Sequence, residues 1–337
     1  MTHPQTLIVS LEPEIVRRTR KYVGEHSNYE TLSEFVAVAI ENQLALEGAL
    51  PTTRGVPRSS HESGVDEARP PVPSDATLAL LKKPTRSRRS AAVDPTADRA
   101  LPSFTNRLLP VKVAARVLSN VDEQETLARF QRLAAQAARE LGLRVRQEDE
   151  EAGRRGWSRR WVALPVGQDP EAALNRFTHH FTLVLASDGR LHGPLAALGL
   201  AAIDDSEKVA PTDLGNDLAL MANPVLDGIG GEHAVLSDAE QELFVSAIRQ
   251  SPVELAAVRE FLGLAESHRG KQADVDASLA AARREGWSKA QAVAHRAAMV
   301  GRLRDLAMVE VEGRGPAARI RVGPQAEQFL EGVTHGA

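Results

Sequence analysis

The first 47 residues contain a short strand pattern and two helix patterns, and this order restricts how the chain can fold. Apolar and polar side chains alternate over residues 6–11, as in a strand with one buried face. A helix is predicted from Pro13, since proline suits a first helical position. A second follows residues 31–34, which form a capping box. About 45 residues make only a marginal core, so we expect two copies to pair through their strands.

This pattern resembles the ribbon-helix-helix DNA-binding family over residues 5–46. The matching stretches are Leu11-Glu12-Pro13-Glu14, Thr31-Leu32-Ser33-Glu34 and Ala39-Ile40-Glu41-Asn42. The resemblance implies a homodimer or higher homo-oligomer whose paired strands enter the major groove of double-stranded DNA. By position, it directs Thr6, Ile8 and Ser10 toward the bases and places the amides of Thr31, Leu32 and Ser33 at a phosphate.

A second interpretation of residues 1–47 is that they only dimerise or bind a partner protein. Ile8 can contact a thymine methyl group but cannot make the paired hydrogen bonds that discriminate best between bases. The segment also has four Lys and Arg against seven acids, whereas phosphate binding favours a basic surface.

Composition limits the class of protein. A length of 337 residues is typical of two or three domains. The absence of cysteine excludes disulfides, thiolate zinc sites and cysteine nucleophiles. The chain starts without a signal-peptide pattern and has no apolar run of about 20 residues, so we expect a cytoplasmic protein that does not enter a membrane.

Residues 48–103 are rich in Pro, Ser, Thr and Arg and show little periodicity, which predicts a disordered, basic linker. Leu78-Ala79-Leu80-Leu81 could form a short docking helix. A basic cluster could contact DNA phosphates, or could simply be solvated and keep the linker extended. Its members are Lys82, Lys83, Arg86, Arg88 and Arg89.

Three modules are predicted to follow, over residues 104–165, 166–235 and 236–332, each with a helix before a small hairpin. The fold class is therefore mainly α with small β elements: a ribbon-helix-helix domain, a disordered linker and tandem winged-helix-like modules. Residues 170–222 and 236–331 resemble winged helix-turn-helix domains of prokaryotic regulators. In the last module, a helix over 288–306 precedes strands at 308–311 and 319–322.

In a winged helix, the helix before the hairpin enters the major groove and the hairpin contacts the backbone. The resemblance implies DNA contacts from His295, Arg296, Arg302 and Arg304 on the helix and from Arg314, Arg319 and Arg321 on the hairpin. The alternative is that the strand arginines form the solvated face of the hairpin, or that the module packs against a partner subunit.

The first module is predicted to have a helix over 127–140, a strand at 141–145 and a return strand at 161–164. Basic and aromatic residues near its turn could support nucleic-acid binding, although we favour a core position for Trp161. They are Arg154, Arg155, Trp157, Arg159, Arg160 and Trp161.

The middle module is predicted to have a helix over 191–198, strands at 199–203 and 209–211, and a helix capped by Thr212. Residues 166–235 hold three Lys and Arg against ten acids, which would repel phosphate, so a protein partner is expected here.

Catalytic patterns are weak. His179 and His180 are adjacent on a predicted helix and point about 100° apart, so they cannot both bind one ion even with His192 and Asp188 nearby. No glycine-rich loop carries the lysine and hydroxyl of a phosphate-binding loop. We therefore expect no enzyme activity, cofactor or metal.

Three hypotheses remain from the sequence. The first is a sequence-specific, homodimeric transcriptional regulator with additional DNA contacts from its C-terminal winged helix. The second is a DNA-tethered adaptor or antitoxin-like protein whose C-terminal modules bind a partner. The third is an architectural or partition-type DNA-binding protein.

Overall fold

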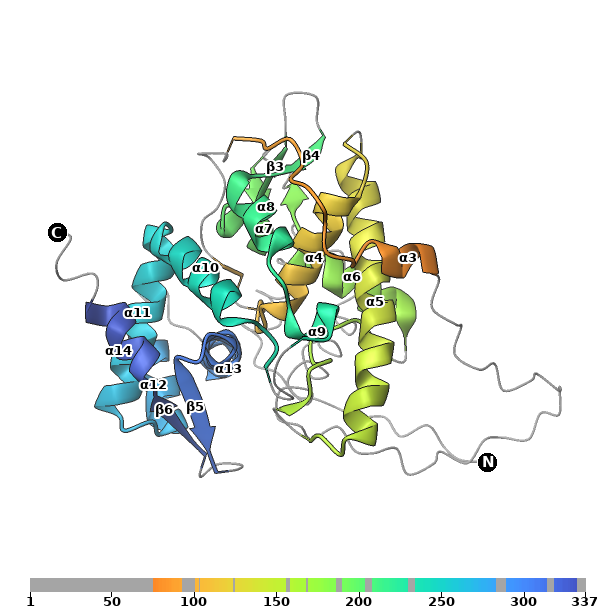
Figure 1. Ribbon diagram of the computed structural model, residues 1–337. Coiled ribbons are helices and arrows are strands. Elements are labelled where there is room, and N and C mark those ends of the chain that lie inside the picture. Colours follow the sequence, from red (N-terminus) through yellow and green to blue (C-terminus); the bar gives the residue numbers. More distant parts are fainter. Residues whose placement is uncertain are drawn as a thin grey trace, which may run out of the picture. The chain divides into compact units, whose positions relative to one another are not determined.

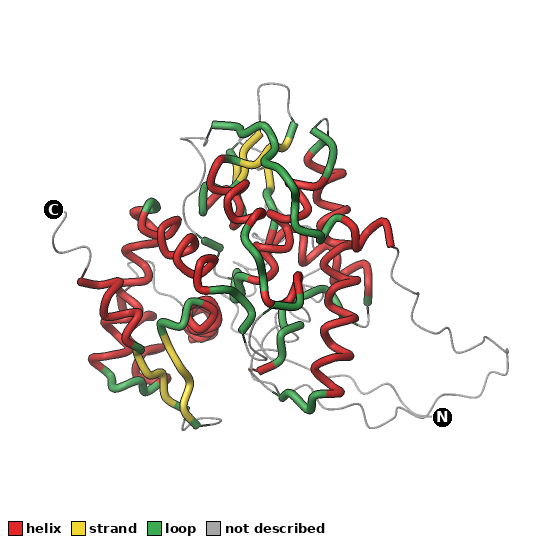
Figure 2. The backbone as a smooth tube through the Cα atoms, in the orientation of Figure 1, coloured by secondary structure: helices red, strands yellow, loops and turns green. Residues whose placement is uncertain are grey.

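The computed structural model describes residues 75–92, 101–102, 104–123, 125–155, 158–167, 169–185, 190–203, 208–229, 234–282, 289–313 and 318–331. These residues are mainly helical with small two-stranded antiparallel sheets, which confirms the predicted mixture of α and small β elements (Figures 1 and 2). Residues 64–337 form one compact unit, distinct from residues 1–63. The predicted ribbon-helix-helix elements and the first part of the predicted linker lie outside the described residues.

Helix α4 (Leu109–Asn120) is the centre of the first part of this unit. Every residue of the helix except Asn120 is buried. It packs against α5 (Leu127–Glu151), α6 (Pro170–Phe181), α7 (Pro194–Ala197) and α8 (Asp213–Leu220) (Figure 1). The predicted modules 104–165 and 166–235 therefore share one core around α4.

The hairpin predicted in the first module is wrong. Helix α5 continues unbroken through residues 141–145, and residues 161–164 form turns. Leu141, Gly142 and Val145 are buried because their spacing places them on one helical face. A Cβ on Gly142 would lie 2.6 Å from a Val166 methyl carbon and 2.9 Å from Leu164 Cβ. This glycine permits close packing inside a helix and does not end it.

The hairpin predicted in the middle module is confirmed. Strands β3 (Ala201–Ile203) and β4 (Val209–Pro211) pair antiparallel, with Ala202 opposite Ala210. The Thr212 hydroxyl accepts a hydrogen bond from the Gly215 amide and caps α8, as predicted. The helix predicted over 191–198 is shorter, because 191–192 form a strand. The smaller elements here are β1 (Val184–Leu185), β2 (Leu191–His192), α7 and α9 (Pro224–Asp227).

The C-terminal module contains the predicted long helix and hairpin. Helix α13 (Lys289–Asp305) precedes strands β5 (Val309–Glu312) and β6 (Arg319–Val322), which pair antiparallel. Lys271 adds an antiparallel bridge to Arg319 on β6. Gly270 makes this close approach possible, since its φ is +70° and a Cβ there would lie 2.0 Å from the Ile320 carbonyl oxygen. The other helices are α10 (Asp238–Arg249), α11 (Pro252–Ser267), α12 (Gln272–Ala282) and α14 (Pro324–Glu331).

Residues 75–92 correct the prediction of a wholly disordered linker. Helix α3 (Asp75–Ala79) overlaps the predicted docking helix, and Leu81 is buried. The Asn120 side-chain amide donates to the carbonyls of Leu80 and Lys82, while the Ala91 amide donates to the Pro211 carbonyl. Polar contacts to the main chain order this stretch despite its low hydrophobicity. Among the helices described, none has the length and apolarity needed to span a bilayer.

Candidate nucleic-acid and protein contact sites

The ribbon residues Thr6, Ile8, Ser10, Thr31, Leu32 and Ser33 lie outside the described residues, so their DNA contacts stay a prediction. The linker cluster is described. Lys82, Lys83, Arg86 and Arg89 are exposed, as a phosphate contact requires.

Arg88 differs from the rest of the linker cluster. Its guanidinium donates to the carbonyls of Leu118 at 2.6 Å and Asp122 at 3.2 Å, and its main chain exchanges hydrogen bonds with the Asn216 side chain. Burial lowers the pKa of Arg88, against the opposing effect of nearby carboxylates. Arg88 thus anchors the segment to α4 and α8, which corrects its predicted role as a phosphate contact.

The structure contradicts DNA contacts from Arg302 and His295 on α13, since both side chains are buried. Arg302 is 1% exposed and lies 2.8 Å from a carboxylate oxygen of Glu254 on α11. It also donates to the Thr105 carbonyl at 3.2 Å. Burial lowers its pKa, while Glu254 opposes this effect. The positive charge of Arg302 is therefore balanced by Glu254 inside the protein and does not face the solvent.

Arg296 and Arg304 are only partly exposed. Arg296 Nε lies 2.7 Å from a carboxylate oxygen of Asp276 on α12. Burial lowers the pKa of Arg304, as does the nearby positive charge of Arg107. Of the four residues predicted to contact DNA from α13, none projects from an open helix face.

A second face of α13 is built from small residues at helical spacing: Ala294, Ala297, Ala298 and Gly301. Ala297, Ala298 and Gly301 are buried. A Cβ on Gly301 would lie 2.1 Å from the Asn106 carbonyl oxygen. The segment before α4 therefore lies directly against α13 at Gly301.

On the C-terminal hairpin, Arg319 and Arg321 are exposed as predicted, but they face glutamates. The register places Arg319 opposite Glu312 and Arg321 opposite Glu310. Arg321 also lies 3.4 Å from Glu312, and both side chains are more than half exposed. These strands pair charges of opposite sign, which favours the interpretation as a solvated hairpin face. Arg314 lies outside the described residues.

The basic residues near Trp161 are largely structural. Asp149, fully buried at the end of α5, accepts hydrogen bonds from Arg154 at 2.9 Å and from Arg160 Nε at 2.8 Å. Arg159 lies over the Trp161 ring, 5.5 Å from its centroid. Trp161 is partly buried and packs against the core. Arg155 is exposed, and Trp157 lies outside the described residues.

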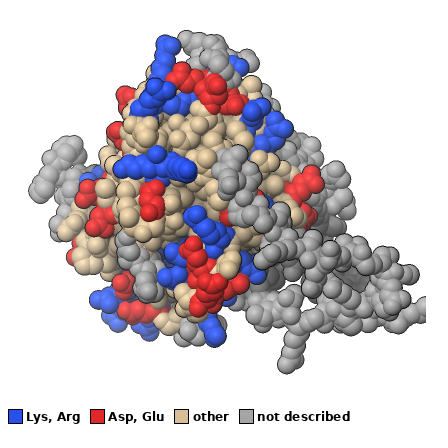
Figure 3. Space-filling model, turned by 45° about the vertical axis from the view of Figure 1, so that its right-hand side comes forward, with Lys and Arg blue, Asp and Glu red and all other residues tan. Residues whose placement is uncertain are grey.

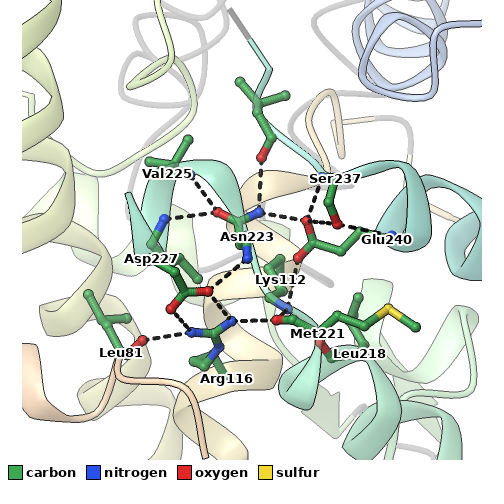
Figure 4. Close-up of polar contacts among 12 residues, drawn as sticks. Leu81, Lys112, Arg116, Leu218, Met221, Asn223, Val225, Asp227, Ser237 and Glu240 are labelled. Carbon is green, nitrogen blue, oxygen red and sulfur yellow. Dashed lines mark hydrogen bonds and ion pairs between the residues drawn. The ribbon is translucent and has the colours of Figure 1, made fainter. Parts of the chain in front are cut away.

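A buried polar cluster joins α4 to α9 and α10, and the sequence analysis did not identify it (Figure 4). Lys112 Nζ lies 2.7 Å from a carboxylate oxygen of Glu240, and both side chains are fully buried. Four residues along α4, Arg116 donates to both carboxylate oxygens of Asp227, at 2.8 and 3.0 Å. The Asn223 side chain donates to Glu240 at 2.8 Å, and its main-chain amide donates to Asp227 at 2.7 Å. We call this cluster the α4 joint.

Main-chain carbonyls complete the α4 joint. Lys112 donates to the carbonyls of Leu218 and Met221, and Arg116 donates to those of Met221 and Leu81. Burial lowers the pKa of Lys112 to about 8, although Glu240 opposes this effect. The extensive pairing identifies a structural joint. The available sequence signal was two cations four residues apart in a helix whose other residues are apolar up to Leu118.

Basic and acidic side chains are interspersed on the face shown in Figure 3, which among the described residues shows no continuous basic surface. Nor do the described residues include a group of three His, Cys, Asp or Glu side chains suited to a metal ion. No protein-family model, curated protein or solved structure matches this chain.

Proposed function

We propose that the protein is a homodimeric DNA-binding regulator that reads DNA through its N-terminal ribbon. The strand and two helices predicted over residues 5–46 carry this proposal, because they need a second copy to bury their apolar faces. Residues 75–331 supply a protein body tethered to that ribbon.

The C-terminal module is, in this proposal, a winged helix. Supporting observations are the order α11, Lys271, α12, α13, β5, β6 and the pairing of Lys271 with β6. His295 and Arg302 on its α13 are buried, and its strand arginines face glutamates. We therefore assign it a role other than reading a second DNA site.

Additional DNA contact is assigned to the exposed linker cations Lys82, Lys83, Arg86 and Arg89. Each phosphate neutralised by such a cation adds about one unit to the salt dependence of binding. These contacts would add affinity without adding sequence preference.

Gel-shift titration of the full chain at several salt concentrations tests these assignments. One variant replaces Lys82, Lys83 and Arg86 by Gln, and a matched variant replaces Arg319 and Arg321 by Gln. We expect the first to reduce the salt slope by about two to three units and the second to leave it unchanged. A lower salt slope for the second variant would indicate that the hairpin arginines do contact DNA. A monomeric full chain at micromolar concentration would contradict the ribbon proposal itself.

A second candidate is a DNA-tethered adaptor, and the exposed Asp213 and Asp217 on α8 favour it. They belong to the most acidic stretch of the chain and leave an anionic face for a basic protein partner. Copurification of a defined partner that is lost when both aspartates become lysine, with DNA binding intact, would support the adaptor. Unchanged copurification would show that the partner does not bind through α8.

A further inference from the structure

Helix α5 carries a row of arginines along one face. The row contains Arg129, Arg132, Arg139 and Arg146, with Gln136 among them. At 3.6 residues per turn, these five positions lie within an arc of about 100° and extend over about 26 Å of the helix. Arg139 is half-buried, and the other four side chains are exposed. We call this set the α5 row.

Charge is unevenly distributed along α5. Residues 127–147 contain five arginines and one acid, Glu140, whereas residues 148–151 are all acidic. Cations near the N-terminus of a helix and carboxylates near its C-terminus are both unfavourable for the helix dipole. The stability of the helix therefore does not account for the α5 row.

The carboxylates next to the α5 row leave its charges accessible. Arg129 lies 3.0 Å from Glu125, and the arginine side chain is 62% exposed. Arg146 lies 2.8 Å from Glu150 and is 45% exposed. Exposed ion pairs of this kind are weak, so a phosphate can compete for both arginines.

Two members of the α5 row are held in position by groups beside the helix. The Arg146 guanidinium lies over the Trp161 ring, 5.4 Å from its centroid. Arg139 donates a hydrogen bond to the Pro165 carbonyl at 3.0 Å. Contacts that restrict a long side chain reduce the entropy lost when it binds a partner.

The basic linker cluster is fixed beside the same helix. Helix α3, which leads into this cluster, packs against α5 (Figure 1). The Asn120 side chain donates to the Lys82 carbonyl, and Arg88 donates to the Asp122 carbonyl in the turn before α5. Two sets of exposed cations from separate parts of the sequence are therefore anchored on the same side of the core.

The side chains of the α5 row favour a nucleic-acid backbone over a protein as its partner. A DNA duplex carries negative charge along its whole length, whereas a stable protein interface has an apolar centre with buried anchor residues. The exposed members of the row are arginine and glutamine. Leu143 lies on the same face and is only partly exposed, so it offers little apolar area to a protein.

We propose that the α5 row is a further DNA-binding surface, which contacts the phosphate backbone of duplex DNA and does not read its sequence. This inference rests on the proposed DNA-binding function and adds a site to it. Together with the linker cations, the row holds residues 75–331 on DNA that the ribbon has bound. Weak sites joined by a tether gain affinity through their effective concentration.

Binding of a dye-labelled DNA duplex to the full chain, followed by fluorescence anisotropy at several salt concentrations, tests this proposal. The row variant replaces Arg129, Arg132 and Arg146 by Gln. Because each lost phosphate contact lowers the salt slope by about one unit, we expect this slope to fall by about two to three units. Replacing the same three residues by Lys keeps the charges and should keep the slope within about one unit of the original.

A control variant replaces Arg269, Arg319 and Arg321 by Gln, which removes the same charge from exposed residues elsewhere. We expect its salt slope to equal that of the unmodified chain. Equal slopes for the row variant and the unmodified chain would overturn the α5 proposal and leave DNA binding by the ribbon intact. Absence of duplex binding by the unmodified chain would contradict both proposals. A row variant that loses affinity for labelled polyglutamate but not for DNA would assign the row to an acidic protein instead.

A second measurement uses the unmodified chain, so it does not depend on how the variants fold. Phenylglyoxal modifies accessible arginines, and mass spectrometry reports the rate at each position with and without saturating duplex. We expect DNA to slow the modification of Arg132 and Arg146 at least about threefold and to leave the rates at Arg319 and Arg321 unchanged. Unchanged rates at Arg132 and Arg146 in the DNA complex would overturn the proposal.

Discussion

Helices α4 and α13 both carry basic side chains that end up buried, but they use them differently. On α4, the cations Lys112 and Arg116 bind carboxylates and main-chain carbonyls of the elements around them. On α13, Arg302 pairs with Glu254, a carboxylate that also accepts from a main-chain amide. The first arrangement joins helices around α4, whereas the second holds the segment before α4 against α11 and α13. Basic residues on a helix therefore do not by themselves indicate a nucleic-acid binding site. The role of each cation depends on the group that it contacts in the folded protein.

The largest predicted effect is on the α4 joint. Lys112→Met leaves Glu240 buried without its cation, and breaking a buried ion pair in this way costs about 3–5 kcal/mol. Urea unfolding at pH 7 measures the change in the free energy of unfolding. A loss under about 1 kcal/mol would show that the pair is not a main support of the core.

The close contact between α13 and Asn106 is tested by a matched pair of glycine substitutions. Gly301→Ala places a Cβ against the Asn106 carbonyl and should cost about 1–3 kcal/mol. Gly263→Ala, on α11, meets no atom within 4 Å and should stabilise the protein by about 0.5–1 kcal/mol. Thermal unfolding of both variants checks the comparison. Equal effects would mean that the main chain at Asn106 moves aside without cost.

The pH dependence of stability should distinguish the α4 joint from an ordinary surface pair. The pKa of Lys112 is lowered from its ordinary value of 10.5 to about 8 in the folded chain. Between these two pH values, the Lys112 side chain therefore holds more protons in the unfolded chain than in the folded chain. Rising pH in this window therefore favours the folded state through this group. The unfolding free energy of the unmodified chain should rise with pH relative to that of Lys112→Met between pH 8 and 10.5. Parallel pH profiles would contradict the lowered pKa.

His180, next to Phe104, should make the stability of the protein sensitive to acid. Its ring stacks on Phe104, with centroids 4.0 Å apart. Burial lowers the pKa of His180 to about 3, and His179 and Arg176 act in the same direction. The unfolded chain takes up a proton as pH falls below the ordinary value of 6.5 whereas the folded chain does not, so stability is lost in that direction. In urea unfolding between pH 7 and 4, His180→Phe should show a smaller loss than the unmodified chain.

The smallest effect is expected on the hairpin. Arg321 and Glu312 form an exposed pair, and such pairs contribute about 0–1 kcal/mol. Arg321→Gln should therefore leave the unfolding temperature nearly unchanged. A large loss would indicate that the hairpin arginines have a structural role.

Local patterns predicted some elements well and failed at others for identifiable reasons. The two hairpins at 201–211 and 309–322 were predictable, because turn residues separate two short strand patterns in each: apolar residues in the first, and alternating apolar and charged residues in the second. The break predicted at Leu141-Gly142 was wrong, because this glycine is needed for packing against Leu164 and Val166. Of the candidate site residues, the linker cations Lys82, Lys83, Arg86 and Arg89 are exposed, and their contact with DNA stays a prediction. Arg88 and Arg302 did not match their predicted roles, since their partners come from distant parts of the chain.

The sequence by itself determined the mainly helical class, the absence of cysteine chemistry and the positions of several caps and hairpins, because these depend on residues a few positions apart. Only the tertiary structure decided that 104–235 share one core, that Lys112, Arg116 and Arg302 are buried and paired with carboxylates, and that the segment before α4 lies against Gly301. Those outcomes depend on carboxylates and carbonyls in distant parts of the chain, and no local pattern specifies which distant group will meet a given side chain.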